Sequence, residues 1–230
     1  TSSNVSSQNA DATGVSVGGL LAAGVVKATA ESASTVHAGV GDATRLISGA
    51  VTLNARGEDK NTADATAGTG GLIAGNASLA RTVTKSTTDV AIGDLADWDV
   101  SKLVATATHS TKYGASADST GAGVLNASGA NAENDVQADV ILSVGEKARI
   151  ASDSSIRLAT ENNIDSVLVG KLAASAAGGG VLTGSASQVS TTLAGSSAVD
   201  IGNGAQLYAS GSPAGSDAVG YRGGYQREHG

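Results

Sequence analysis

A repeat of 52 residues is the feature that most limits how this chain can fold. A Gly-rich apolar motif recurs as GGLLAAG from Gly18, GGLIAGN from Gly70, AGVLNASG from Ala122 and GGVLTGS from Gly179. A second motif, an aliphatic residue followed by Gly and a polar residue, recurs as VGDATRL from Val40, IGDLADW from Ile92, VGEKARI from Val144 and IGNGAQL from Ile201. Both motifs recur at steps of 52, 52 and 57 residues, so the chain consists of about four copies of one unit.

The repeats predict one shaft and a short tail. We expect the shaft over residues 1–215 and a non-repeat tail, a cap or a contact segment, over 216–230. The units fall near 10–55, 56–108, 109–161 and 162–213. Since both motifs lengthen their last step by five residues, we expect one insertion before the fourth unit, within Ala159 to Lys171.

Within a unit, apolar and polar residues alternate with a period of two. This alternation is seen in AVTLNA (50–55), SIRLAT (155–160) and AVDIGNGAQLYAS (198–210). Such a period is typical of a strand with one buried face, and the many Gly and β-branched residues disfavour helix. The sequence therefore predicts an all-β fold.

Units made of strands and Gly, Asn or Asp turns cannot bury their apolar faces alone and must stack on one another. A parallel β-helix, which is a solenoid, satisfies this requirement. A coil of ~20–26 residues is common, so we expect two coils in each unit and a rod of roughly 40 Å. A propeller is the main alternative, but its blades usually carry aromatic signatures, and this chain has no Phe, one Trp and four Tyr.

Composition excludes several classes of function. A net charge of −7 argues against nucleic acid or an anionic membrane as partner. The absence of Cys excludes a disulfide scaffold, a thiolate metal site and a Cys nucleophile. No apolar run approaches the roughly 20 residues of a membrane helix. Since the sequence starts without Met and the repeat is already running by Ala10, we expect a mature product or a part of a longer rod.

Four segments carry a family resemblance: IGNGAQLYAS, VTLNA, ADATAGTGGLIAGNAS and AIGD. They resemble the repeat region of large exported bacterial adhesins, the filamentous-haemagglutinin-like and leukotoxin-type filamentous adhesins. The resemblance covers about Asn9 to Ser212. It implies a right-handed parallel β-helix shaft, exported by two-partner secretion or as an autotransporter passenger, that acts in attachment or in a biofilm matrix. It supplies no catalytic motif, and the export route rests on analogy because the family's N-terminal secretion domain is not in the sequence.

The expected function is therefore that of a structural shaft, secreted or on the bacterial cell surface, without catalysis and without a cofactor. Expected partners are other copies, neighbouring repeats of a longer chain, or host or matrix glycans. The alternatives are a β-helical polysaccharide lyase or hydrolase and an ice- or glycan-binding solenoid. An enzyme would need a groove with clustered Asp, Arg and Lys, whereas charges here are thinly spread. An ice-binding face needs Thr in register on every coil, and RTVTKSTTDV (81–90) is not repeated.

Three acidic residues, Asp94, Asp97 and Asp99, surround the single Trp in GDLADWDVSK. They are the candidate ligands for a structural Ca²⁺, which takes six to eight oxygen ligands. The alternative is a solvated turn whose Asp side chains accept hydrogen bonds from backbone N–H groups. We favour the turn because no other unit repeats the triplet.

The aromatic and histidine residues have plain structural interpretations. Trp98 takes the position of Leu46 and Ile150 in neighbouring units, so we expect it to pack inward rather than to form a sugar-stacking platform with Tyr113. The three histidines share no ligand spacing and no partner acid, so each is expected to face solvent: His37, His109 and His229.

Two further groups of residues are interaction candidates. The tail holds Tyr and Arg, which favour interfaces, and we expect it to contact a neighbouring subunit or domain through Tyr221, Arg222, Tyr225 and Arg227. Glycosylation sequons occur at Asn4, Asn76 and Asn126, as expected in a chain rich in Asn, Ser and Thr. The Gly-rich motifs lack the Gly-Lys-Ser/Thr of a phosphate loop and predict tight corners instead.

Overall fold

The computed structural model describes residues 1–168 and 173–210, and the backbone of residues 215–218 and 222–223. In this part of the chain every regular element is a β-strand. The strands are β1 (Ser2–Val17), β2 (Leu21–Val40), β3 (Arg45–Gly70), β4 (Ile73–Ile92), β5 (Asp97–Ala122), β6 (Leu125–Val144), β7 (Arg149–Ser166), β8 (Ala174–Gly179), β9 (Leu182–Ile201), β10 (Gln206–Ala209), β11 (Gly215–Ala218) and β12 (Arg222–Gly223).

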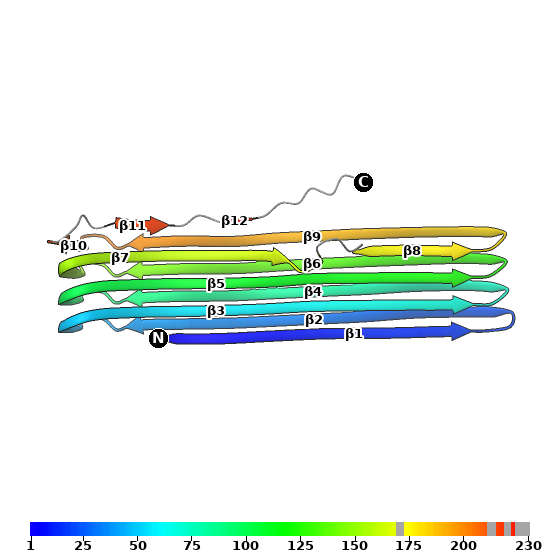
Figure 1. Ribbon diagram of the computed structural model, residues 1–230, viewed down its shortest axis with the longest axis horizontal. Coiled ribbons are helices and arrows are strands. Elements are labelled where there is room, and N and C mark those ends of the chain that lie inside the picture. Colours follow the sequence, from blue (N-terminus) through cyan, green and yellow to red (C-terminus); the bar gives the residue numbers. More distant parts are fainter. Residues whose placement is uncertain (169–172, 211–214, 219–221, 224–230) are drawn as a thin grey trace.

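The strands form two parallel sheets. The first has the order β1-β3-β5-β7-β10, with β8 beside β5 and with β11 and β12 beside β7; the second has the order β2-β4-β6-β9. The chain runs along one sheet, turns, returns along the other sheet and turns again (Figure 1). The fold is thus a parallel β-solenoid flattened into two layers, which confirms the all-β, stacked-repeat prediction. Its right-handed sense stays a prediction.

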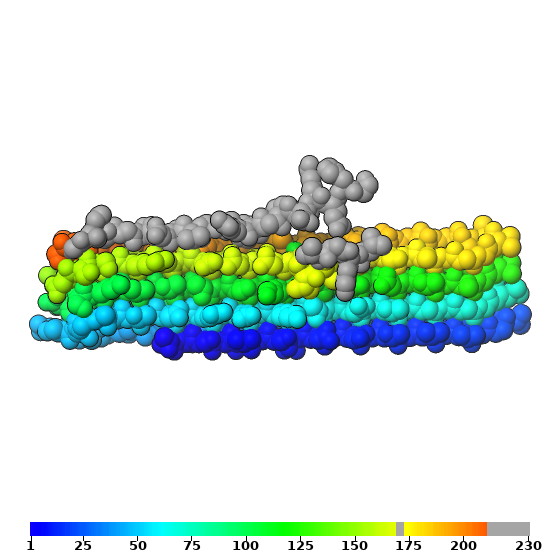
Figure 2. Space-filling view, viewed as in Figure 1, coloured from blue at the N-terminus to red at the C-terminus, as the bar shows by residue number. Residues whose placement is uncertain are grey.

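Each 52-residue unit forms one coil. Ile73 pairs with Leu125, and Thr52 pairs with Val104, in ladders whose partners lie 52 residues apart. The expectation of two coils in each unit is wrong, because strands of up to 26 residues run the whole length of a sheet without a turn. Such a strand is about 85 Å long, whereas four coils stacked ~4.8 Å apart rise by roughly 20 Å instead of 40 Å. The long axis of the molecule therefore follows the strands (Figure 2).

The five extra residues of the last repeat step enter at two places. One enters where Val100 pairs with Ser152 but Lys102 pairs with Ser155, which is a bulge in β7. The other four lie between Ser166, which pairs with Tyr113, and Ala174, which pairs with Ala117. The predicted insertion within Ala159 to Lys171 therefore overlaps the larger addition and misses the bulge.

Both repeated motifs are turns. The Gly-rich motif joins the first sheet to the second, and the second motif returns the chain. In every copy of the second motif the residue three places after the aliphatic residue has a positive φ: Ala43 (52°), Leu95 (56°), Lys147 (54°) and Gly204 (73°). For a residue other than Gly this conformation costs roughly 1–2 kcal/mol. Hydrogen bonds to the next coil offset the cost, since the N–H of Ala43 donates to the carbonyl of Asp94 at 2.7 Å and that of Leu95 donates to Glu146 at 2.9 Å.

Side chains between the sheets form zones along the strands. An aliphatic cluster lies beside the second-motif turns and includes Val90, Ile92, Trp98, Leu103, Leu142 and Ile150. An alanine cluster lies nearer the Gly-rich turns and comprises Ala28, Ala30, Ala63, Ala65, Ala80, Ala115, Ala117, Ala130 and Ala132. Between them the interior is largely polar, and this middle zone holds the candidate site.

Candidate functional site

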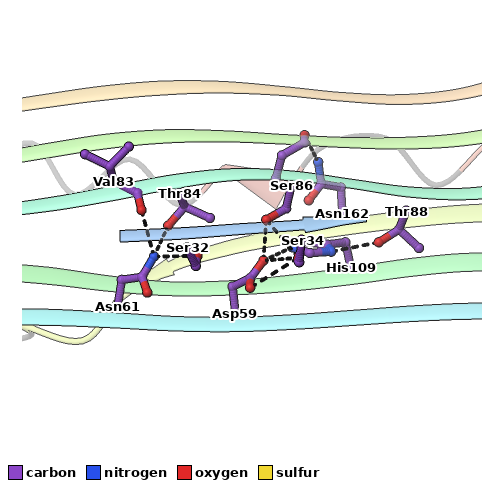
Figure 3. A network of polar contacts seen from close by, with 11 residues as sticks. Ser32, Ser34, Asp59, Asn61, Val83, Thr84, Ser86, Thr88, His109 and Asn162 are labelled. Atoms are coloured by element: carbon purple, nitrogen blue, oxygen red, sulfur yellow. Dashed lines mark hydrogen bonds and ion pairs between the residues drawn. The ribbon is translucent and has the colours of Figure 1, made fainter. Parts of the chain in front are cut away.

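A belt of inward-facing polar side chains crosses the middle of the solenoid between the two hydrophobic clusters (Figure 3). We call it the buried polar belt; its members are Ser32, Ser34, Asp59, Asn61, Thr82, Thr84, Ser86, Thr88, His109, Thr111, Asn134, Thr160 and Asn162. All are at most 8% exposed. Since a buried polar group without a partner is costly, contacts within the belt determine whether the two sheets can close.

Asp59 is the centre of the belt. Its carboxylate accepts hydrogen bonds from the hydroxyls of Ser34 at 3.1 Å and Ser86 at 2.5 Å, and both donors belong to the opposite sheet. His109 Nε2 lies 3.0 Å from Asp59 Oδ2, and both side chains are fully buried. Burial raises the pKa of Asp59, but the contacts with the imidazole and the two Ser hydroxyls outweigh it and hold the pKa below its ordinary value. The carboxylate is thus ionised at neutral pH.

His109 fits into the interior because its register partner is a glycine. Gly57 on β3 pairs with His109 on β5, and a Cβ at Gly57 would lie within 2.5 Å of Thr88 Oγ1 and closer still to His109 Nδ1. The other ring nitrogen of His109, Nδ1, lies 2.9 Å from the hydroxyl of Thr88. The imidazole therefore occupies the space that a side chain at position 57 would fill.

Asn61 and Asn162 extend the belt on either side of this centre. The amide of Asn61 donates to the hydroxyls of Ser32 at 2.8 Å and Thr84 at 2.5 Å. The amide of Asn162 donates to the backbone carbonyl of Ala138 at 2.7 Å. Each bond joins a side chain of the first sheet to the second sheet, so the belt links the layers and fixes their relative register.

Thr88, His109 and Asp59 are connected in the order hydroxyl, imidazole, carboxylate, which is also the order of a nucleophilic triad. The three residues are at most 2% exposed, so no substrate reaches the hydroxyl. The hydroxyls of Ser34 and Ser86 also donate hydrogen bonds to the Asp59 carboxylate. The arrangement can hold a buried charge and align two sheets, and it is not built for turnover.

The three candidate Ca²⁺ ligands are not gathered into a site. Asp94 lies in a second-motif turn, where its Oδ1 accepts the N–H of Glu146 at 2.7 Å. Asp97 lies 3.2 Å from Arg149 Nη1 of the next coil, and Asp99 is exposed on the outer face of β5. No group of three or more Asp, Glu, His or Cys side chains in the described part of the chain is arranged to hold a metal ion. The Asp94 contact is the one expected of a solvated turn, except that the N–H it accepts belongs to the next coil.

The aromatic residues pack inward. Trp98 is fully buried in the aliphatic cluster and pairs with Leu46 and Ile150, which confirms its predicted position. Tyr113 is 8% exposed and packs beside Val136, so the sugar-stacking alternative is wrong for this pair.

The expectation for the histidines holds in one case. His37 is exposed as predicted, although its Nδ1 lies 2.5 Å from Asp89 Oδ2, a partner acid that the sequence did not suggest. For His109 the prediction is wrong, because Gly57 and Asp59 provide an interior place for the imidazole. His229 lies outside the described residues.

Two other groups of candidates have simple outcomes. The sequon residues Asn76 and Asn126 are 8% and 6% exposed and face inward, which leaves no room for a glycan on either. In the tail, the backbone of Arg222 pairs with Asn163, whereas Tyr221, Tyr225 and Arg227 lie outside the described residues. The expected tail contact therefore stays a prediction.

A shallow depression on the outer face of the second sheet is the other chemically interesting feature. It has a volume of about 450 Å³ and is lined by Glu31, Ser32, Ala33, Arg81, Val83, Lys85 and Asp135. Arg81 Nε lies 3.6 Å from the carboxylate of Glu133, and both side chains are over one third exposed. Mixed charges on an open face can contact a charged glycan, but they give a substrate no enclosure.

Comparison with known proteins identifies no relative: no family model, no curated protein and no solved structure matches this chain. Within the described residues there is also no helix with the length and hydropathy needed to cross a membrane.

Proposed function

We propose that this chain is a non-catalytic structural shaft of a secreted bacterial surface adhesin or biofilm-matrix fibre. One observation supports the proposal above all. The two middle coils stack in one register from end to end, β3 on β5 and β4 on β6, and every second-motif turn has the same geometry. A stack of this kind supplies length and stiffness, since each backbone hydrogen bond between coils acts along the axis of the stack.

Side chains on the outer faces support the same role. Three ion pairs join register partners on neighbouring coils: His37–Asp89, Arg81–Glu133 and Asp97–Arg149. Exposed pairs of this kind contribute little each, about 0–1 kcal/mol. The pairs help to fix the register between coils, because a coil shifted by one residue would lose all of them. The same shift would also move the inward-facing side chains of that coil to the outer face.

The proposed location and partners follow from the family resemblance and from the shape. A shaft outside the cell would associate with further copies, with neighbouring repeats of a longer chain, or with host or matrix glycans. The resemblance to filamentous adhesins remains part of this proposal. No cofactor is required for it.

The competing function is a polysaccharide lyase or hydrolase, and the depression around Arg81 is where such chemistry would have to occur. Glu31 and Asp135 lie on strands separated by β4, with Val83 between them. A sugar bound there would remain open to solvent, which is unfavourable for a charged transition state.

Electron microscopy of the purified chain, combined with an activity assay, tests the proposal. We expect ribbons that grow in the direction of coil stacking and whose width is about 85 Å for each chain across, the length of one strand. We also expect no release of unsaturated or reducing sugars from polyuronates. Discrete short particles that cleave polyuronate, with loss of cleavage in Glu31→Gln or Asp135→Asn, would refute the shaft and establish the enzyme.

A further inference from the structure

A continuous aliphatic ridge lies along the end of the solenoid where the Gly-rich turns stack, the end at which β1, β3, β5 and β8 meet the second sheet (Figure 1). Each coil contributes its last turn residue and the first outward residue of the following strand. The ridge comprises Leu20, Leu21, Leu72, Ile73, Val124, Leu125, Val181 and Leu182. Leu21, Ile73, Leu125 and Leu182 are register partners in successive strands, so the ridge is a straight row across the coils.

The ridge is exposed in every coil. Its side chains are between 42% and 87% exposed, with the lowest values in the two inner coils, where the neighbouring coils cover part of each side chain. At ~60–120 Å² for a fully exposed aliphatic side chain, eight of them present roughly 400 Å² of apolar surface. In the first coil three Val residues are also 75–82% exposed: Val25, which lies on the same outer face as Leu21, and Val15 and Val17, which lie on the outer face of the first sheet.

The described residues at this end of the solenoid carry no charged side chain. Four segments that flank the ridge contain no Asp, Glu, Lys or Arg: 12–26, 65–80, 119–132 and the described residues 173–199. The nearest charged residues on the second sheet are Lys27, Arg81 and Glu133. In a chain with a net charge of −7, the four segments named above contribute none of the charged side chains that usually keep apolar edges apart.

We infer that the ridge is a lateral interface for a second copy of this chain, packed ridge to ridge. The inference names the partner of the proposed shaft and so rests on that function. A standard interface buries about 800 Å² on each partner, and the eight ridge side chains alone present about half of that area. The side chains repeat at the coil spacing on both copies, so two ridges related by a two-fold axis fit each other row by row.

The chemistry of the end favours protein over lipid as the occupant. Segments that lie in a membrane interface carry Trp or Tyr beside the apolar residues and Lys or Arg around them. The ridge and the segments that flank it contain no aromatic and no basic residue. Flat rows of Gly and Ala beside Leu, Ile and Val suit close packing against a matching surface.

Sedimentation velocity on the full chain tests the interface with two matched double variants. Ile73→Lys/Leu125→Lys places charges at two outward ridge positions that are 45% and 42% exposed. Ile47→Lys/Val5→Lys makes the same change at two aliphatic residues that are 74% and 67% exposed and lie outside the ridge. We expect the wild type to dimerise, the ridge variant to weaken dimerisation at least tenfold, and the control variant to change it less than twofold. Matching circular dichroism melts check that all three fold.

Cross-linking gives an independent reading, because the chain has no Cys of its own. Leu72→Cys should form a disulfide-linked dimer under mild oxidation much faster than Ile47→Cys. A monomeric wild type, equal effects of the two double variants, or equal cross-linking would overturn the inference. So would binding to phosphatidylcholine vesicles that the ridge variant alone loses, since the occupant would then be lipid.

Failure of this interface and failure of the shaft have different signatures. If ribbons form in electron micrographs but sedimentation and cross-linking show no ridge contact, the interface is wrong and the shaft stands. If ridge-dependent dimers form but no ribbon grows and polyuronate is cleaved, the shaft is wrong and the interface stands.

Discussion

Removal of the His109 imidazole should strongly destabilise the protein, because it leaves a buried carboxylate without one of its partners. His109→Ala leaves the Asp59 carboxylate at zero exposure, with two Ser hydroxyls as donors but without the neighbouring imidazole. Breaking a buried ion pair by removing one partner typically costs about 3–5 kcal/mol. We expect His109→Ala to lower the free energy of unfolding by about this amount at neutral pH, where the Asp59 carboxylate is ionised.

The double variant isolates the pair. Because Asp59→Ala/His109→Ala removes both partners, it should cost less than the sum of the two single variants, with a coupling of about 1–3 kcal/mol. Urea unfolding followed by circular dichroism supplies the four free energies. His37→Ala is the control, since its imidazole also contacts a carboxylate but is 58% exposed and should change stability by less than about 1 kcal/mol. A cost of His109→Ala no larger than that of His37→Ala, or additivity of the two single variants, would refute this account of the belt.

Four further outcomes are expected. The pKa of Asp59 lies below its ordinary value of 3.8 in the folded state, so ionisation of this carboxyl stabilises the fold above that pH. This stabilisation is lost as the pH falls through the folded pKa. Acid titration of unfolding should therefore show a steeper loss of stability below about pH 4 in the wild type than in Asp59→Asn. Gly57→Ala pushes a methyl group into the imidazole and should cost about 1–3 kcal/mol, measured by urea unfolding, whereas Gly75→Ala, with open space around it, should not. Asp94→Ala removes one hydrogen bond between turns and should cost about 0.5–1.5 kcal/mol in the same assay, and a neutral result would show that the turn ladder is dispensable. Addition or chelation of Ca²⁺ should leave the melting temperature within about 1 °C, because a bound ion would raise it; a clear rise that Asp97→Asn abolishes would contradict this.

The sequence predicts the repeat and the turns well, and it misjudges the length of the strands. Val40, Ile92 and Val144 mark turns because Gly and a polar residue follow each of them. No such signal divides β3 or β5, yet natural strands average five to six residues, so a 26-residue strand lies outside ordinary expectation. The missing turn is what makes one unit a single coil.

The buried polar belt was missed because Asp, Asn and Thr normally face solvent. The alternation along each strand does contain the signal, because every second residue faces inward. Asp59 and Asn61 fall on the same face as the buried Ala63, and Thr88 falls on the same face as Val90 and Ile92. The pairing of His109 with Gly57 also follows from the 52-residue step. The distance between Asp59 and the Ser hydroxyls of the other sheet cannot be predicted from the repeat, because it depends on how the two layers face each other.

The stacking of residues 52 apart is the basis of the proposed shaft, and disulfide trapping measures it directly. Thr52→Cys/Val104→Cys joins two outward register partners, whose Cα atoms in neighbouring parallel strands fall within the 4.4–6.8 Å range that a disulfide bridges, at about 4.8 Å. In dilute, mildly oxidised protein we predict rapid intramolecular cross-linking of this pair and none for Thr52→Cys/Ser78→Cys, which are half a unit apart in the sequence and lie on opposite sheets. Cross-linking of the second pair in preference to the first would mean that each unit forms two coils, and it would contradict the flattened solenoid on which the shaft and its ridge depend.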